Sequence, residues 1–174
     1  EFFDANGYVE VETPALQVSP GMEPHLEAFA TTLLDVAGEG RRMGLHTSPE
    51  FAMKKLLAAG MDRIWQMARV YRNGERSARH HPEFTMIEWY ATGAGWRDIA
   101  RQTEDLVRAV CGPVARHRGH EVPLGGPWEY LSVAEAFERY AGIDILATAP
   151  DPLRPDRDAL AKQASDIGIR TADD

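Results

Sequence analysis

The sequence predicts an α+β fold in which an antiparallel sheet is flanked by helices. Strand-like and helix-like segments follow one another without the regular alternation that parallel sheets require. Two strand candidates, residues 62–72 and 83–91, are joined by a polar loop, and strands connected in this way pair antiparallel. The 174 residues suit one domain with a buried core, so we expect residues 1–174 to form a single unit.

The first half of the chain supplies most of the strands. Gly7 ends a helical turn, and Pro14 closes an alternating segment, as proline does at the end of a strand. The expected elements here are a helix end at 1–6, strands at 8–14, 25–36 and 43–47, a turn-rich loop at 18–24 and a hairpin turn at 38–42.

A helix is expected after residue 48. Ser48 is a good N-cap, and Pro49 suits the first helical position. Met53 and Leu56 follow at helical spacing, and Gly60 ends the element.

The second half is more helical. Apolar residues at helical spacing predict a helix that begins at about Trp96. Ser132 and Glu135 form a capping-box pattern, and Asp156 is placed to cap a last helix that runs to about Ile167. The histidine-bearing stretch 116–120 is interpreted as a loop.

The segment 83–91, "EFTMIEWYA", carries a carboxylate inside a strand. Strand side chains alternate between two faces, so the segment divides into a face with Phe84, Met86, Glu88 and Tyr90 and a predicted core face with Thr85, Ile87 and Trp89. Two interpretations of Glu88 stay open: a solvated residue in a salt bridge, or a carboxylate that binds a cationic ligand in a cleft.

Arg72 lies at the other end of the same hairpin. An arginine at a strand end can bind a phosphate through two parallel hydrogen bonds. A surface ion pair worth at most about 1 kcal/mol is the alternative.

Composition excludes several classes of protein. The net charge is −8 and no basic run exceeds a pair, which disfavours a nucleic-acid interface on this segment. No apolar run approaches the roughly 20 residues that cross a bilayer, so we expect no membrane partner. The single cysteine, Cys111, favours a reducing compartment, which we take as cytoplasmic. The histidines lack other ligands at metal spacing, so no metal site is expected.

Three stretches together resemble the catalytic core of the class II lysyl-tRNA synthetases. They are "GYVEVETP", "TSPEFAMKKLL" and "VYRNGERSARHHPEFTMIEWY". "TSPE" and "EWY" favour the shorter elongation factor P lysine ligases within that family, because the synthetases tend to read "APE" and "MELY". The resemblance covers the whole chain and is most specific in the hairpin.

The resemblance implies an ATP site on the hairpin. Arg72 matches the arginine that holds the α-phosphate, and Phe84 matches the ring that stacks on adenine. Asn73, Glu75 and His81 fall in the same ATP-binding loop, where His81 replaces the usual asparagine.

It also implies an amino-acid site and a dimer. Ser48 and Glu50 would line the amino-acid site, Glu50 and Glu88 would bind the α- or β-ammonium, and Tyr90 would contact the side-chain end. "GYVEVETP" matches the motif whose strand and preceding helix form a homodimer interface, with Pro14 as its proline.

Two departures from the family pattern stand out. The family has arginine, one residue, then glutamate, whereas this chain has Gly74 at the third position and Glu75 after it. Either Glu75 takes the adenine-reading role or the backbone does. In addition, no match to the later glutamate-bearing strand or to motif 3 occurs before Asp174. We therefore expect a domain that is incomplete at both ends and inactive alone, with its Mg²⁺ ligands in the missing C-terminal part.

The expected function is ATP-dependent activation of lysine or β-lysine through an aminoacyl adenylate, followed by transfer to a lysine of elongation factor P. The alternatives are a lysyl-tRNA synthetase fragment with tRNA as acceptor, and an inactive synthetase-like dimerisation or binding module. ATP and Mg²⁺ are the implied cofactors.

Overall fold

The computed structural model describes residues 1–171, which divide into two compact units, residues 1–112 and residues 113–171. Residues 172–174 of the predicted domain lie outside the described part. Helices and antiparallel sheets are mixed, consistent with the predicted α+β class. That residues 1–174 act as one catalytic domain stays a prediction. Within residues 1–171, no helix combines the length and the apolar character that a membrane span requires.

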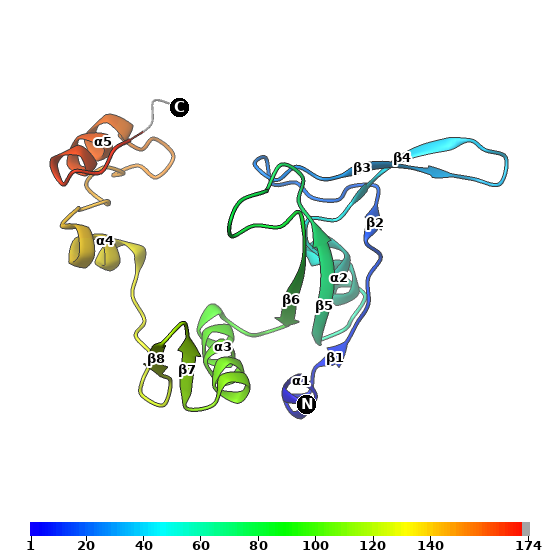
Figure 1. Ribbon diagram of the computed structural model, residues 1–174, viewed down its shortest axis with the longest axis horizontal. Helices are drawn as coiled ribbons and strands as arrows, with labels where there is room; N and C mark the ends of the chain where they lie inside the picture. The colour runs from blue at the N-terminus through cyan, green and yellow to red at the C-terminus, as the bar shows by residue number, and fades with distance from the viewer. Residues whose placement is uncertain (172–174) are drawn as a thin grey trace. The chain divides into compact units, whose positions relative to one another are not determined.

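Figure 1 labels the elements in chain order. Those of the first unit are α1 (Phe2–Ala5), β1 (Val9–Glu10), β2 (Leu16–Gln17), β3 (Ala30–Leu34), β4 (Gly40–Leu45), α2 (Glu50–Ala58), β5 (Arg63–Tyr71), β6 (Glu83–Ala91) and α3 (Trp96–Cys111). The second unit contains β7 (Val114–His117), β8 (His120–Pro123), α4 (Val133–Ala141) and α5 (Arg157–Asp166).

The predicted central hairpin is confirmed. β5 and β6 pair antiparallel along their full length, from Arg63 opposite Ala91 to Tyr71 opposite Glu83. β1 joins the other side of β5 in parallel, so the sheet order is β1-β5-β6. Among the described strands, β6 therefore has a neighbour on one side only. α2 packs against β5, as Figure 1 shows.

The predicted core face of β6 is wrong at two of its three residues, Thr85 and Ile87. Residues directly opposite in an antiparallel pair share a face, and Glu88 lies opposite Gln66, which is 4% exposed. The half-buried face of β6 is therefore the one that carries Glu88, whereas Thr85 and Ile87 are exposed. The apolar character of Ile87 suggested the opposite, but neighbouring segments, not the strand's own sequence, decide which face is covered.

An aromatic cluster covers one end of the other face. The ring of Phe3 stacks on Trp65 with centroids 4.7 Å apart and lies 5.6 Å from Trp89. Tyr8 meets Phe3 edge-on at 5.5 Å. This cluster holds the short helix α1 against the sheet and keeps Trp89 half-buried.

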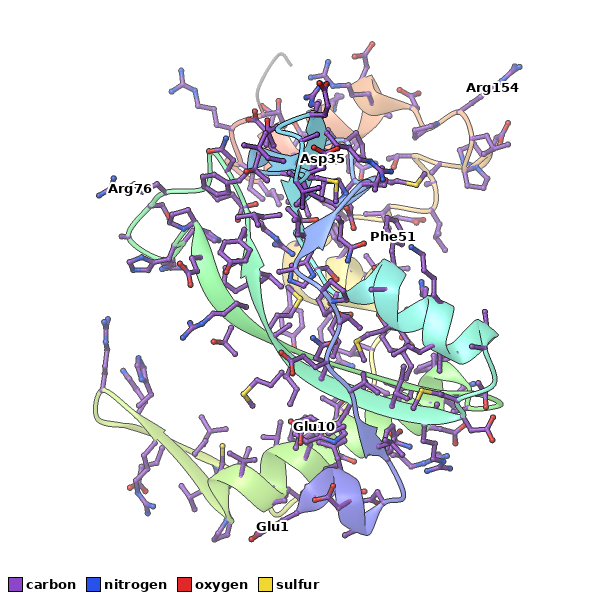
Figure 2. The ribbon with its side chains drawn as sticks, turned by 90° about the vertical axis from the view of Figure 1, so that its right-hand side faces the viewer. Glu1, Glu10, Asp35, Phe51, Arg76 and Arg154 are labelled. Carbon is purple, nitrogen blue, oxygen red and sulfur yellow. The ribbon has the colours of Figure 1, made fainter. Side chains whose placement is uncertain are left out.

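A second sheet has the order β2-β4-β3, all antiparallel. Its hairpin turn spans residues 35–39 and lies earlier in the chain than predicted, because Arg41 and Arg42 belong to β4. Asp35, labelled in Figure 2, fixes the turn by accepting hydrogen bonds from the backbone N–H groups of Ala37 and Glu39, each at 2.9 Å.

Local capping signals are confirmed. Ser132 Oγ accepts from Glu135 N at 3.1 Å, and the Glu135 carboxylate accepts from Ser132 N at 2.7 Å. Asp156 accepts from Ala159 N at 2.9 Å and begins α5. The β7–β8 hairpin was missed, because its two-residue turn uses Arg118 at φ 49° and Gly119 at φ 84° rather than an Asn-Gly pair.

Candidate active site

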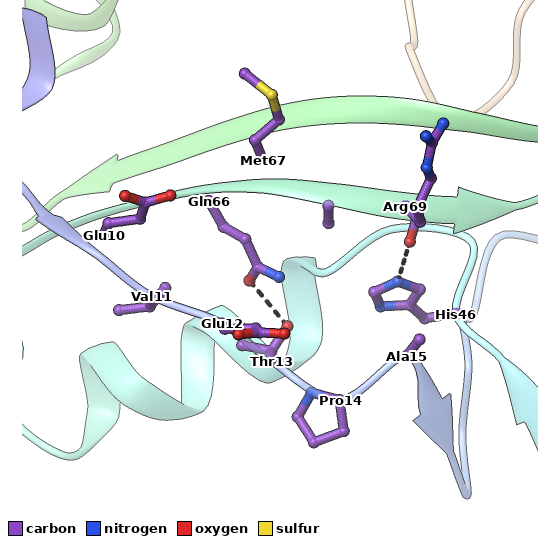
Figure 3. A pocket seen from close by; sticks show the side chains of 11 residues that line it. Glu10, Val11, Glu12, Thr13, Pro14, Ala15, His46, Gln66, Met67 and Arg69 are labelled. Atoms are coloured by element: carbon purple, nitrogen blue, oxygen red, sulfur yellow. Dashed lines mark hydrogen bonds between the residues drawn. The ribbon is translucent and has the colours of Figure 1, made fainter. Parts of the chain in front are cut away.

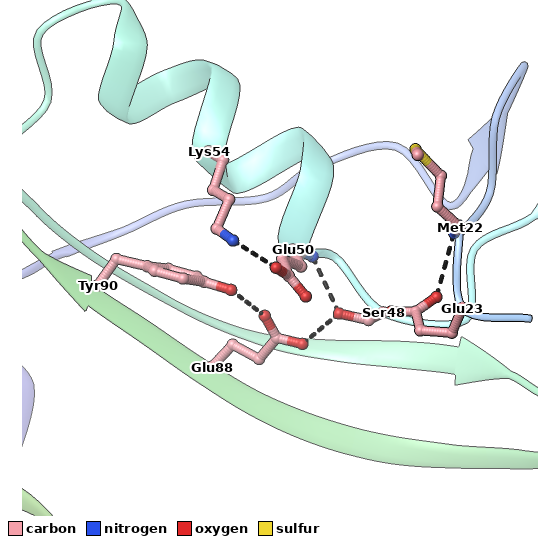
Figure 4. Close-up of polar contacts among 7 residues, drawn as sticks. All are labelled: Met22, Glu23, Ser48, Glu50, Lys54, Glu88 and Tyr90. Carbon is pink, nitrogen blue, oxygen red and sulfur yellow. Dashed lines mark hydrogen bonds and ion pairs between the residues drawn. The ribbon is translucent and has the colours of Figure 1, made fainter. Parts of the chain in front are cut away.

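Glu88 is the centre of a polar cluster between β6 and the start of α2. Its carboxylate accepts a hydrogen bond from Ser48 Oγ through one oxygen and a 2.7 Å hydrogen bond from the Tyr90 hydroxyl through the other (Figure 4). It makes no ion pair within residues 1–171, so the salt-bridge interpretation is not supported. The structure brings three predicted site residues into direct contact.

Ser48 links this cluster to Glu50. Its Oγ accepts a 3.0 Å hydrogen bond from the backbone N–H of Glu50 while its own proton is donated to Glu88. α2 begins at Glu50, one residue later than predicted, yet the serine still satisfies an N–H of its first turn. The same hydroxyl therefore fixes both the helix start and the rotamer of Glu88.

Glu50 has a cationic partner on its own helix. Lys54 Nζ pairs with Glu50 Oε1 one turn further along, at the spacing that lets side chains of a helix meet. The lysine side chain is 53% exposed, so the pair is open to solvent and can be displaced. Lys54 was not predicted as a site residue.

Tyr90 is held neutral. Burial, the hydrogen bond to Glu88 and the nearby charges of Glu88 and Glu50, in that order, raise the pKa of Tyr90 far above its usual 10. The phenol therefore stays a hydrogen-bond donor across the whole physiological range.

A third carboxylate, Glu23, lines a small hollow beside this cluster. The lining residues are Pro20, Gly21, Glu23, Thr47, Ser48, Glu50 and Phe51. Gly21 is required there, because a Cβ at that position would lie 2.5 Å from Thr47 Oγ1. Sequence reasoning placed Glu23 in a turn-rich loop and missed it, since no motif or periodicity marks it.

Arg72 reaches the same region from the end of β5. Its Nε donates to the carbonyl of Thr47 at 3.4 Å, and its guanidinium lies 5.3 Å above the centre of the Phe84 ring. No carboxylate in residues 1–171 pairs with it, so the surface ion pair considered from the sequence is not formed. Arg72 is thus a cation available to an anionic ligand.

The other residues of the predicted ATP loop form fewer side-chain contacts with Arg72. Asn73 Oδ1 accepts from Gly74 N at 3.0 Å, which shapes the loop backbone. No hydrogen bond or ion pair in the described chain connects Glu75 or His81 with Arg72. Arg76, labelled in Figure 2, points away from the loop into solvent.

A separate hollow of about 710 Å³ lies along residues 10–15, beside His46 and residues 66–69 (Figure 3). The Thr13 hydroxyl donates to Gln66 Oε1 at 2.9 Å, and His46 Nε2 lies 2.6 Å from the carbonyl oxygen of Arg69. It contains Pro14 of the predicted dimer motif and none of the predicted ligand-binding residues.

Comparisons with known proteins identify the family to which this chain is similar. The family model of tRNA synthetases class II (D, K and N) matches residues 1–167. An elongation factor P--(R)-beta-lysine ligase from Vibrio vulnificus is 41% identical over 181 residues, covering 97% of this chain and 54% of that protein. The ligase of the same name from Haemophilus ducreyi is 35% identical, covering 100% of this chain and 48% of that protein. The chain spans about half the length of these curated relatives.

Proposed function

The chain belongs to the family of class II tRNA synthetases (D, K and N), and from this premise we propose that it is part of an ATP-dependent ligase acting on elongation factor P. The substrate would be lysine or (R)-β-lysine, activated as an adenylate. The ligases of Vibrio vulnificus and Haemophilus ducreyi support this acceptor over tRNA. The observation that carries the proposal is the cluster of Ser48, Glu88 and Tyr90 beside two further carboxylates, Glu23 and Glu50.

This cluster suits a dicationic amino acid. Glu23 and Glu50 line one small hollow, and Glu88 lies beside it through its hydrogen bond with Ser48. Among the described residues, Lys54 is the one side-chain cation that pairs with any of these carboxylates. A carboxylate in a partly desolvated site attracts an ammonium much more strongly than one in open water. In the proposed complex, Glu88 and Glu50 bind ammonium groups of the substrate, and Tyr90 contacts its side-chain end.

ATP would bind at the end of the same hairpin. Arg72 has no carboxylate partner among the described residues, so its guanidinium is free to bind the α-phosphate, and Phe84 would stack on the adenine. Asn73, Glu75 and His81 would form the loop over the nucleotide. Arg72 Nε donates to the carbonyl of Thr47, the residue before Ser48, and this contact supports a proposal in which the two substrates would bind next to each other.

The proposed reaction begins when a carboxylate oxygen of the amino acid attacks the α-phosphorus of ATP. A P–O bond forms to that oxygen, and pyrophosphate leaves. Arg72 stabilises the charge that develops on the phosphorus oxygens, so the protein contributes position and positive charge rather than a nucleophile. In the second step the ε-amine of the acceptor lysine attacks the acyl carbon, an amide bond forms and AMP leaves.

Enzymes of this family generally use Mg²⁺ with ATP. The described residues contain no group of three His, Cys, Asp or Glu side chains that could hold a metal ion. That the Mg²⁺ ligands lie outside residues 1–171 is a further part of this proposal. Dimerisation through residues 8–14 and a cytoplasmic location also belong to the proposal.

ATP–pyrophosphate exchange by the full-length protein tests the first step. We expect exchange that depends on lysine or (R)-β-lysine and is absent with neutral amino acids. Labelled amino acid incubated with ATP and either elongation factor P or tRNA then tests the acceptor. Label in tRNA alone would contradict the ligase and support the synthetase alternative, and no exchange with any amino acid would contradict activation altogether.

A further inference from the structure

The segment that contains Glu27 is bound to the predicted ATP loop. Glu27 and Asn73 form an isolated antiparallel bridge, in which Asn73 N donates to the carbonyl of Glu27 at 2.7 Å. Asn73 directly follows Arg72, whose guanidinium lies over Phe84. The backbone of Glu27 is thus fixed to the residue that directly follows Arg72, at the start of the predicted ATP loop.

The carboxylate of Glu27 lies next to Gly74. A Cβ built on Gly74 would be 3.9 Å from Glu27 Oε2, and no other heavy atom comes within 4 Å of it. Gly74 is the position at which the family pattern has glutamate and this chain has none. The Glu27 carboxylate, which comes from a distant segment of the chain, therefore lies next to the position that the Cβ of a residue at position 74 would occupy.

The Glu27 carboxylate is available to bind a ligand. Glu27 is exposed, and no hydrogen bond or ion pair within residues 1–171 uses its side chain. By contrast, no contact directs Glu75, the other carboxylate of the loop, toward Arg72 or Phe84. Of these two residues, only Glu27 is held next to Arg72 by the backbone bridge to Asn73.

We propose that Glu27 supplies the carboxylate that selects the nucleotide base in this site, accepting a hydrogen bond from the exocyclic amine of adenine. A carboxylate accepts hydrogen bonds and cannot donate when ionised, so it favours a base edge with an amine over one with a carbonyl oxygen. This inference rests on the proposed function to the extent that ATP binds beside Arg72 and Phe84. It replaces both earlier candidates, Glu75 and the backbone.

Calorimetric binding of ATP and of inosine triphosphate to the full-length protein tests the inference without requiring the reaction. Inosine triphosphate carries a carbonyl oxygen where adenine has the amine. Wild type should prefer ATP by about tenfold, the ratio expected from one hydrogen bond to a charged group. Glu27→Ala should remove most of this preference. Glu27→Gln should reduce the preference for ATP by strengthening the binding of inosine triphosphate, because the amide can donate a hydrogen bond to the carbonyl oxygen of that base.

Two variants separate Glu27 from its neighbours. Glu75→Ala removes the other loop carboxylate and should leave the preference unchanged. Gly74→Glu added to Glu27→Ala should restore the preference in part, because the space beside Gly74 is open, although φ of 75° disfavours a side chain there. Thermal unfolding of Glu27→Ala should match wild type, since no hydrogen bond or ion pair within residues 1–171 is lost.

Three results would overturn the inference: no preference for ATP in wild type, an unchanged preference in Glu27→Ala, or a loss in Glu75→Ala instead. Failure of the proposed function has a different signature. If amino-acid-dependent exchange is absent while the Glu27-dependent preference for ATP is present, the base-selecting role stands and amino-acid activation fails.

Discussion

The Tyr90 hydroxyl donates a 2.7 Å hydrogen bond to Oε2 of Glu88, two residues earlier on the same face of β6. Because Ser48 occupies the other oxygen, both ends of this carboxylate are held by protein donors. The orientation of Glu88 is thus fixed before any ligand binds. A pre-oriented carboxylate loses less entropy when it binds an ammonium group, and this favours tight binding of a cationic substrate.

Tyr90 predicts a dependence of stability on alkaline pH. Its pKa is raised in the folded state, so the unfolded chain releases the phenolic proton first, at about pH 10. The stabilisation is complete below that pH and is lost as the pH rises above it. Denaturant unfolding of wild type and Tyr90→Phe between about pH 8 and 11 should show a steeper fall for wild type above about pH 10. Parallel curves would contradict the prediction.

Glu88→Gln should weaken amino-acid binding. The amide keeps one acceptor oxygen but turns an N–H₂ group toward either Ser48 or Tyr90, both of which donate, and it removes the negative charge. We expect KM for lysine to rise by roughly tenfold or more, with KM for ATP unchanged. Glu83→Gln, at an exposed position of the same strand, is the control. An equal rise in both KM values would point to general disruption instead.

Arg72→Ala should abolish adenylate formation while the fold stays intact. Loss of one positioned charge at a reacting centre typically lowers the rate by about 10²–10³-fold, and the effect is expected in kcat more than in lysine binding. Arg69→Ala removes an exposed arginine of β5, the strand that ends directly before Arg72, and should behave like wild type in ATP–pyrophosphate exchange. Near-wild-type exchange by Arg72→Ala would remove this residue from the site.

Glu23→Gln tests the carboxylate that the sequence did not reveal. If Glu23, which lies close to Ser48 and Glu50, binds a substrate ammonium, KM for lysine should rise by about tenfold in this variant, since hydrogen bonds to charged groups contribute about 1.5–3 kcal/mol. Glu39→Gln, an exposed carboxylate of the β3–β4 turn, is the matched control. Unchanged KM in Glu23→Gln would exclude this carboxylate from substrate binding.

Local signals predicted the hairpin, the helix after Ser48 and both side-chain caps, because each depends on residues close in the chain. The pairing of Ser48, Glu50, Glu88 and Tyr90 was expected only through the family resemblance. What the sequence did not reveal depends on distant segments. The covered face of β6 follows from what packs against it, and Glu23 reaches the site through a loop with no periodic signal.

The unpaired edge of β6 affects the tendency of the protein to aggregate. This strand has a hydrogen-bonded neighbour on one side only among residues 1–171, and Ile87 and Met67 are exposed on the sheet beside it. Unpaired backbone N–H and C=O groups at such a sheet edge can form hydrogen bonds with strands of other molecules. Recombinant preparations of these 174 residues are therefore expected to aggregate as their concentration rises.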